Sequence, residues 1–142
     1  MKYTIYNPTT GQILSTIAGT QDQPIPPGMA TLPGEISAAE FYISNGVPVQ
    51  KSPDPSNLWS RYDYNYITHT WTINPIISDF LARNYRDLLL QDTVDRINPV
   101  WYAILTAEQQ QELIAYRQAL LDVPQQSGFP TLVEWPAKPT WL

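Results

Sequence analysis

The sequence predicts an α+β fold: an N-terminal antiparallel β-hairpin module followed by a C-terminal helical hairpin and a Pro/Trp-rich extended tail. Three observations predict it. Short segments before residue 74 alternate polar and apolar residues, with turn residues between them. After Pro75 the apolar residues recur about every 3.6 positions, as on a helix. After Pro124, prolines and tryptophans recur in a segment too apolar for disorder and too rich in proline for a helix. We therefore expect two domains, a β-rich module of residues 1–74 and a helical module of residues 75–142.

Three hairpins account for the β-rich module. The predicted strands are residues 3–6, 13–17, 40–44, 47–50, 62–66 and 70–73. The second hairpin is the clearest, because Asn45-Gly46 tolerates the positive φ angles of a type I′ turn. The third hairpin repeats the residue pattern of the first and places His69 where Gly11 lies, at a left-handed turn position. Residues 19–34 are rich in proline and glycine, which predicts a long surface loop or a polyproline-like strap.

Two helices follow. The first begins after Asn74-Pro75, a good N-cap pair, and ends near Thr93. Its predicted apolar face consists of Ile77, Phe80, Leu81, Tyr85, Leu88 and Leu89. The second helix begins at a capping box, Thr106 to Gln109, and ends at Pro124. Its apolar stripe consists of Leu113, Tyr116, Leu120 and Leu121.

Composition and charge exclude several classes of function. The net charge is −5 and the 8 Lys and Arg residues are scattered, so we expect no nucleic-acid partner. The chain has no cysteine and one histidine, which predicts neither a metal site nor a cofactor. The longest apolar run, residues 100–105, is too short to cross a membrane, and no membrane partner is expected.

Candidate chemical groups are few. His69 with Ser60 and Asp63 lacks the nucleophile elbow of a hydrolase, and Asp92 with Asp95 fits solvated carboxylates at a helix end better than a catalytic pair. We therefore expect no catalytic residue and no enzyme. The aromatic residues of the third hairpin are a further candidate, as a ligand platform for stacking sugars, with packing within the sheet as the commoner use. These residues are Tyr62, Tyr64, Tyr66 and Trp71.

The expected C-terminal tail carries three large aromatic side chains. Phe129, Trp135 and Trp141 stand among prolines that stiffen the chain, so they lose little conformational entropy on docking. Small modules also recruit such segments to complete their own cores. Both alternatives are open at this stage: the tail packs within its own chain, or it anchors a partner.

A resemblance to a known family rests on residues 116–124, YRQALLDVP, followed by Gly128-Phe129-Pro130 and by residues 133–139, VEWPAKP. Together with an arginine-led helix, so that the pattern covers Arg83 or Arg86 through Pro139, these residues resemble the phage tail assembly chaperone family, in a form similar to tail proteins of cyanobacterial phages. The first half is more weakly similar to the β-rich region that precedes this module in tail proteins. The stretch between the helices, residues 92–101, departs from the Asp-Trp pair and Pro-Asp turn of many relatives.

The resemblance implies a non-enzymatic bacteriophage tail protein. Our leading hypothesis is an accessory structural component of the tail fibre or baseplate, located in the virion tail and in the host cytoplasm during assembly. One alternative is a transient assembly chaperone that is absent from the mature virion, and another is a carbohydrate-binding tip protein. Expected partners are other phage tail proteins, with a homo-oligomer as an open alternative. The candidate partner-binding residues are Tyr116, Arg117, Phe129, Trp135, Pro136 and Trp141.

Overall fold

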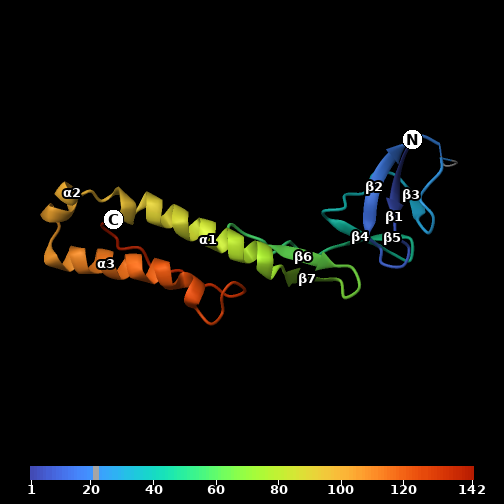
Figure 1. The fold of residues 1–142 in the computed structure, drawn as a ribbon. Helices are drawn as coiled ribbons and strands as arrows, with labels where there is room; N and C mark the ends of the chain where they lie inside the picture. The colour runs from blue at the N-terminus through green and yellow to red at the C-terminus, as the bar shows by residue number, and fades with distance from the viewer. Residues whose placement is uncertain (21–22) are drawn as a thin grey trace. The chain divides into compact units, whose positions relative to one another are not determined.

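The structure is a computed structural model that describes residues 1–20 and 23–142. Short antiparallel strands precede the helices, which confirms the predicted α+β class (Figure 1). The chain forms two compact units, which we call the β-rich unit and the helical unit. The β-rich unit comprises Met1–Asp54 and Tyr64–Thr72, and the helical unit comprises Pro55–Asp63 and Ile73–Leu142. Division into domains at residues 74 and 75 stays a prediction.

The first sheet of the β-rich unit has three antiparallel strands in the order β2-β1-β3. They are β1 (Lys2–Tyr6), β2 (Ile13–Ala18) and β3 (Ala30–Pro33). The prediction of an irregular segment over residues 19–34 is therefore wrong at its C-terminal end, while residues 21–22 lie outside the described part. An edge strand tolerates proline because its outer N–H groups need no partner, and this accounts for Pro33, which pairs with Tyr3.

The second hairpin is confirmed. Its strands are β4 (Phe41–Ser44) and β5 (Val47–Gln50), which pair from Ser44 with Val47 to Phe41 with Gln50. At the turn, Asn45 has φ 51° and Gly46 has φ 75°. The turn of the first hairpin contacts β4: the Ile43 N–H donates to the Gly11 carbonyl at 2.9 Å, and a Cβ on Gly11 would lie 2.1 Å from the Ile43 oxygen. Only glycine fits there.

The third hairpin consists of β6 (Tyr62–Asn65) and β7 (Thr70–Ile73). Its turn repeats the geometry of the first, as the sequence pattern predicts. Asn65 Oδ1 accepts the N–H groups of two following residues at 2.8 and 3.1 Å, and Asn7 Oδ1 does the same at 2.9 and 3.2 Å. His69 has φ 56° and Gly11 has φ 74°, so both occupy left-handed turn positions.

The helical unit contains three α-helices and two short 3-10 turns within its described residues. In chain order they are α1 (Pro75–Asp92), η1 (Val94–Arg96), α2 (Pro99–Ile104), α3 (Ala107–Asp122) and η2 (Val123–Gln125). Two predicted helix starts are confirmed: Asn74 Oδ1 accepts the Ile77 N–H, and the capping box of Thr106 and Gln109 is complete. The sequence analysis missed α2, although its Asn98-Pro99 start repeats the Asn-Pro signal of α1. No described helix has the combination of length and apolar character that a membrane span requires.

The predicted apolar face of α1 is wrong in part. The buried residues are Ser78, Ala82 and Leu90, whereas Phe80 is 63% exposed and Leu88 is 54% exposed. The Ser78 hydroxyl accepts the Arg61 N–H at 2.9 Å, because the segment before β6 lies against this side of the helix. Small side chains allow that close approach, so the buried stripe is rotated from the one that hydrophobicity alone predicts.

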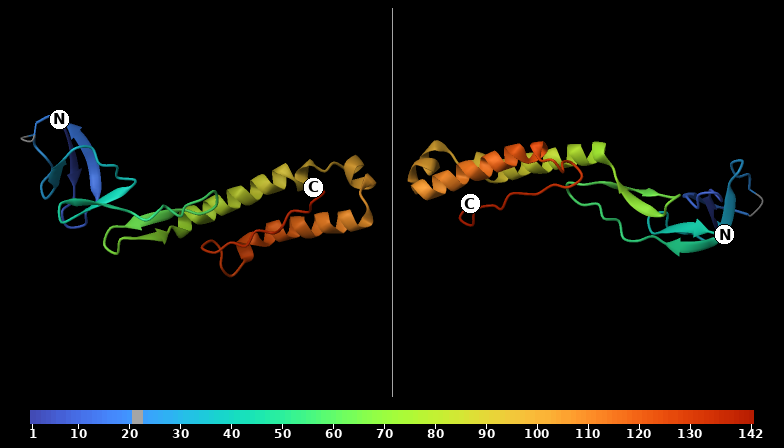
Figure 2. Two further views of the ribbon diagram at one scale, coloured as in Figure 1. Left: turned by 180° about the vertical axis from the view of Figure 1, so that it is seen from behind. Right: turned by 90° about the horizontal axis from the view of Figure 1, so that it is seen from below.

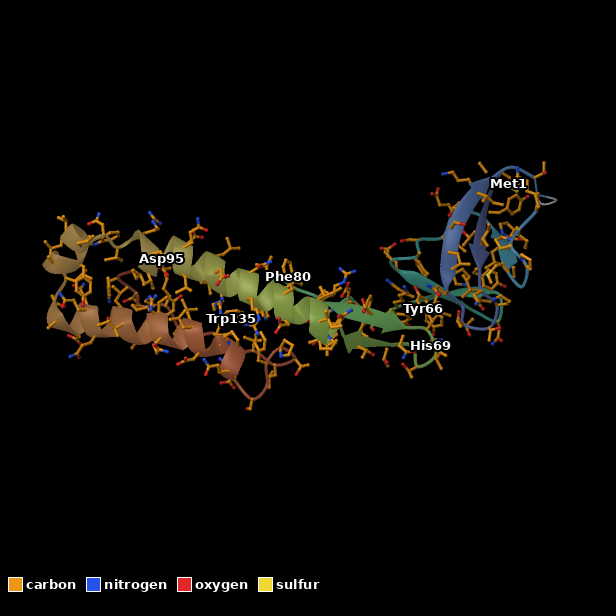
Figure 3. The ribbon with its side chains drawn as sticks, in the orientation of Figure 1. Met1, Tyr66, His69, Phe80, Asp95 and Trp135 are labelled. Atoms are coloured by element: carbon orange, nitrogen blue, oxygen red, sulfur yellow. The ribbon has the colours of Figure 1, made fainter. Side chains whose placement is uncertain are left out.

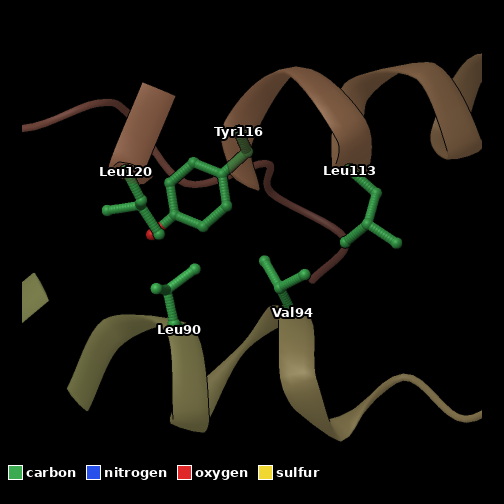
Figure 4. Close-up of a cluster of buried hydrophobic side chains, with 5 residues drawn as sticks. All are labelled: Leu90, Val94, Leu113, Tyr116 and Leu120. Carbon is green, nitrogen blue, oxygen red and sulfur yellow. The ribbon is translucent and has the colours of Figure 1, made fainter. Parts of the chain in front are cut away.

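The main core of the helical unit lies between α1 with η1 and α3. Its buried members are Leu90, Val94, Leu113, Tyr116 and Leu120 (Figure 4). These include three of the four predicted stripe residues of α3, and the fourth, Leu121, packs against them partly buried. Trp135, Trp141 and Leu142 also pack against this cluster. The tail therefore contributes to the core of its own chain.

Candidate functional site

The segment of residues 126–142, which we call the strap, runs back along α3 toward the α2 end (Figures 1 and 2). Gln126 closes its first loop. The Gln126 Nε2 donates to the Glu134 carbonyl at 2.7 Å, and the Gln126 Oε1 accepts the Glu134 N–H at 2.9 Å. One side-chain amide thus pairs with the backbone as a strand would. This loop directs the following residues toward the helices.

Trp135 packs against other aromatic rings of the helical unit (Figure 3). Its ring meets the Tyr85 ring edge-on, with centroids 4.8 Å apart, and the Trp59 ring, with centroids 5.8 Å apart. Tyr85 and Trp59 contact each other at 5.0 Å. Such edge-to-face pairs contribute about 0.5–1.5 kcal/mol each beyond their buried area. The Trp135 Nε1 is buried and has no hydrogen-bond partner among the described residues. The position of Trp135 is therefore set by ring packing.

The end of the strap lies against α3. The Trp141 Nε1 donates to Glu112, and the Lys138 ammonium donates to the Leu142 carbonyl at 2.6 Å. A shallow groove separates this segment from α3 and is lined on the strap side by residues 136–141, which include Pro136. Phe129 lies near the start of the strap, where its ring is half-buried and 5.3 Å from the Arg83 guanidinium carbon. All four predicted strap residues thus have contacts within the chain, and their role toward a partner stays a prediction.

Tyr116 and Arg117 have opposite environments although they are adjacent in α3. Tyr116 is 5% exposed, and this burial raises the pKa of its phenol. Arg117 is exposed and forms no ion pair with any residue that the structure describes. Only Arg117 of this pair is therefore accessible to a partner without a change in the fold.

Arg117 borders an open cavity of about 400 Å³ that the sequence analysis did not identify. We call it the α2 cavity. It is lined by Val94, Ile97, Pro99, Tyr102, Leu113, Ile114 and Arg117. The adjoining helix α2 also has exposed apolar side chains: Val100 is 77% exposed and Ile104 is 78% exposed. The sequence feature that could have indicated this cavity is the Asn98-Pro99 helix start. It predicts a short apolar helix, α2, next to the start of α3.

The predicted aromatic platform surrounds a lysine that the sequence analysis also missed. The Lys51 ammonium lies 4.6 Å from the Tyr64 ring centre and 4.7 Å from the Tyr66 ring centre, and it donates to the Tyr66 hydroxyl at 2.9 Å. It also donates to the Ala38 carbonyl at 2.7 Å. Trp71 lies farther away, at 6.0 Å from the ammonium. The rings are thus occupied by a cation of their own chain, and the carbohydrate hypothesis gains no support from this geometry.

Tyr62 and Tyr64 belong to different compact units. The Tyr64 ring contacts the rings of Tyr66 and Trp71 at 5.0 and 5.1 Å. Burial raises the pKa of the Tyr64 phenol, and the neighbouring phenols of Tyr42 and Tyr66 raise it further. The neutral phenol is therefore the favoured form of Tyr64.

The residues considered for catalysis have structural partners. The His69 ring stacks on Tyr42 with centroids 4.2 Å apart. The Ser60 hydroxyl donates to Asn57 at 3.0 Å, and Asp63 accepts from the Asn74 amide at 2.8 Å. Over residues 1–20 and 23–142, no group of three His, Cys, Asp or Glu residues is arranged to hold a metal ion. These side chains serve turns and caps in the structure.

The geometry defines a class of structure: a small helical hairpin module whose apolar core is completed by the aromatic strap of the same chain. Residues 81–140 match the family of phage tail assembly chaperone proteins, and this segment carries that family's module. The match begins within α1 and ends in the strap, so it covers the helical hairpin together with the segment that completes it. The finding confirms the resemblance read from the sequence and indicates a role in phage tail assembly. No curated protein and no solved structure matches the chain significantly.

Proposed function

We propose that this protein is a non-catalytic phage tail assembly chaperone, which binds a partner tail protein in the host cytoplasm during assembly and leaves before the particle is complete. The observation that carries the proposal is the family match over residues 81–140. This assignment fits the family better than our leading hypothesis from the sequence, a permanent component of the tail fibre or baseplate.

The surface of the helical unit supports a holding role. A chaperone must present apolar side chains to a partner that has not yet buried its own. Val100 and Ile104 of α2 and Ile114 of α3 are each more than half exposed. Ile114 lines the α2 cavity, whereas the strap packs against the main core of the helical unit. Binding there leaves the strap in place.

A permanent structural component is the second candidate. One observation favours it: residues 1–80 lie outside the family match, and within them the first two sheets contribute to an apolar cluster of their own. A chaperone that acts only through its helical module has no evident need for this part. Under this alternative, the β-rich unit attaches the protein to the tail fibre or baseplate of the virion.

The number of copies of the protein in mature particles distinguishes the chaperone from the permanent structural component. Particles of the phage that encodes the protein are purified, washed with high salt and analysed by quantitative mass spectrometry, with the tail tube subunit as an internal reference. We expect the protein in the lysate and in tail assembly intermediates, and fewer than one copy per mature particle. Stoichiometric copies in washed particles would overturn the chaperone proposal in favour of the structural component.

Deleting the gene tests the assembly role itself. We expect infected cells to accumulate filled heads without complete tails, and supplying the protein from a plasmid to restore infectious particles. Normal yields of tailed, infectious particles from the deletion would contradict both candidates. Electron microscopy of the lysate provides the readout.

A further inference from the structure

The α2 cavity is an apolar recess with a rigid wall. Its lining includes Ile97, Ile114 and the ring of Tyr102. Helix α2 is held against α3 by the Gln110 side chain, which donates to the carbonyl oxygens of Tyr102 at 3.1 Å and Leu105 at 3.3 Å. The Asn98 side chain also caps the start of α2. The cavity is therefore preformed, which lowers the entropic cost of binding.

The cavity is large enough to hold an apolar side chain of a bound polypeptide. Its volume of about 400 Å³ lies within the range of roughly 300–1,000 Å³ that is usual for ligand pockets. Pro99 and Tyr102 of α2 form one side of the cavity, and Ile114 and Arg117 of α3 form another. An occupant can thus place one aliphatic side chain in the cavity between α2 and α3.

The positive charge of Arg117 in the cavity lining indicates which kind of residue stands next to the aliphatic residue in the bound segment. Among the described residues that line the cavity, Arg117 is the only charged one, and no carboxylate lies beside it in this lining. The two arginines of α1, in contrast, have carboxylate partners: Arg83 pairs with Asp79, and Arg86 pairs with Asp87. An exposed guanidinium beside an apolar recess is complementary to a carboxylate held next to an apolar group, and it can bind that carboxylate through two hydrogen bonds.

We propose that the α2 cavity binds a short acidic-aliphatic segment of a partner polypeptide, with a Leu or Ile side chain in the cavity and an adjacent Asp or Glu on Arg117. The inference rests on the proposed function and names the chemistry of the partner. A nucleic acid does not fit, because its phosphates need several cations and the chain has a net charge of −5. A lone anion does not account for the apolar lining.

A peptide titration tests the proposal. The full-length protein is added to a fluorescein-labelled 12-residue peptide with a central Leu-Asp-Leu-Glu sequence in an Ala/Gln background, and binding is followed by fluorescence polarisation. We expect saturable binding that weakens as the salt concentration rises. Peptides with Asn and Gln in place of the acids, or with Ala in place of the leucines, should bind at least about tenfold more weakly, a loss of about 1.4 kcal/mol.

Protein variants locate the site. Arg117→Glu should weaken binding of the acidic peptide at least tenfold, and Ile114→Ser should weaken it as well. Arg61→Glu is the matched control for the same change in charge, because Arg61 is exposed and lies beside Ser78 near the start of α1. Leu88→Ser is the control for an exposed apolar residue, and both controls should bind like the wild type. Circular dichroism at 222 nm should show unchanged helix content in every variant.

Three outcomes of the peptide titration would overturn the inference. They are equal affinity for the acidic and amide peptides, wild-type affinity of Arg117→Glu, and no binding of any peptide. Light scattering measures the oligomeric state of the free protein and so tests whether a second copy occupies the cavity. A dimer that Arg117→Glu converts to a monomer would show that it does and would overturn the proposal. The copy-number and deletion experiments do not depend on this cavity, so failure of the peptide test leaves the proposed function standing.

Discussion

The β-rich unit and the helical unit differ in the size of their buried apolar clusters and in the polar groups that they bury, because the β-rich unit buries the ammonium of a lysine. In the β-rich unit the buried apolar cluster is small, consisting of Tyr6, Ile13 and Ile43, and two polar residues are buried outside it. Thr4, which is fully buried, bonds to the Gly34 carbonyl and the Ile36 N–H. Lys51 is 9% exposed and bonds to Ala38 and Tyr66.

The helical unit has a larger buried apolar cluster, and its buried polar residues, within the described part of the chain, are the hydroxyl residues Ser60, Ser78 and Thr93. Its buried cluster has five members, and the partly buried residues around it include two tryptophans of the strap. An apolar core loses stability in proportion to the area removed, whereas a buried ammonium or hydroxyl is costly as soon as one partner is lost. The two units should therefore respond differently to substitution.

Removing the strap should have the largest effect. Truncation after Pro124 deletes Trp135, Trp141 and Leu142 from the helical core. Truncating a fully buried tryptophan typically costs about 3–5 kcal/mol, and the two strap tryptophans are partly buried, so their combined loss is a large share of the roughly 5–15 kcal/mol stability of a small domain. We expect weak ellipticity at 222 nm and no cooperative thermal transition. Leu132→Ser is the control in the full chain, since Leu132 is 69% exposed. A truncated protein that melts cooperatively would show that the strap is dispensable.

A cavity in the helical core should have the next largest effect. Leu120 is fully buried, so Leu120→Ala should lower the free energy of unfolding by about 2–5 kcal/mol. Urea denaturation followed at 222 nm measures this change. Leu88→Ala on α1 is the matched control and should change stability by less than about 0.5 kcal/mol, because Leu88 is 54% exposed. Equal losses in the two variants would refute the observed packing of α1 and α3.

Lys51 should be the sensitive point of the β-rich unit. Lys51→Ala removes two hydrogen bonds and the cation beside Tyr64 and Tyr66, for an expected loss of about 1–3 kcal/mol. Amide hydrogen exchange should rise in residues 38–51 and 64–72 while the helices keep their protection. Lys2→Ala is the control, because the ion pair of Lys2 with Glu35 is exposed. Unchanged exchange near Lys51 would show that these contacts contribute little.

High pH should produce the smallest effect. Burial raises the pKa of Tyr116 in the folded state, and its hydrogen bond with Thr93 opposes this shift. The neutral phenol is thus favoured by folding, and its contribution is fully present below the unfolded pKa of about 10 and is lost as the pH rises through the folded-state value. We expect the midpoint of urea unfolding at 222 nm to decline above about pH 10. Tyr116→Phe should decline less steeply from its own value at pH 7, and parallel curves would contradict this assignment.

Local features of the fold could be read from the sequence because neighbouring residues determine them. Asn45-Gly46 adopts the expected left-handed turn, and Asn74 and the Thr106 capping box begin their helices where predicted. The missed helix α2 has the same kind of start, at Asn98-Pro99, and was overlooked because it spans only six residues. The family pattern was also readable, since its residues lie within one continuous segment.

The candidate sites were harder to predict because they join distant parts of the chain. Trp135 meets Trp59, which lies 76 positions earlier, and Lys51 reaches Tyr66 across 15 positions. The α2 cavity needs η1, α2 and α3 together. No residue pattern within a single element indicates such contacts. Arg117 was selected from the family pattern, but the apolar recess beside it was not visible in the sequence.

The sequence alone determined the turns, the helix starts, the α+β order of elements and the family of the helical module, because each depends on contacts among residues a few positions apart. Tertiary structure decided which side of α1 is most buried, since Ser78 bonds to Arg61 while Phe80 and Leu88 of the predicted apolar face stay exposed. It also decided that the strap packs within its own chain, because the helical hairpin leaves apolar area that Trp135 and Trp141 cover.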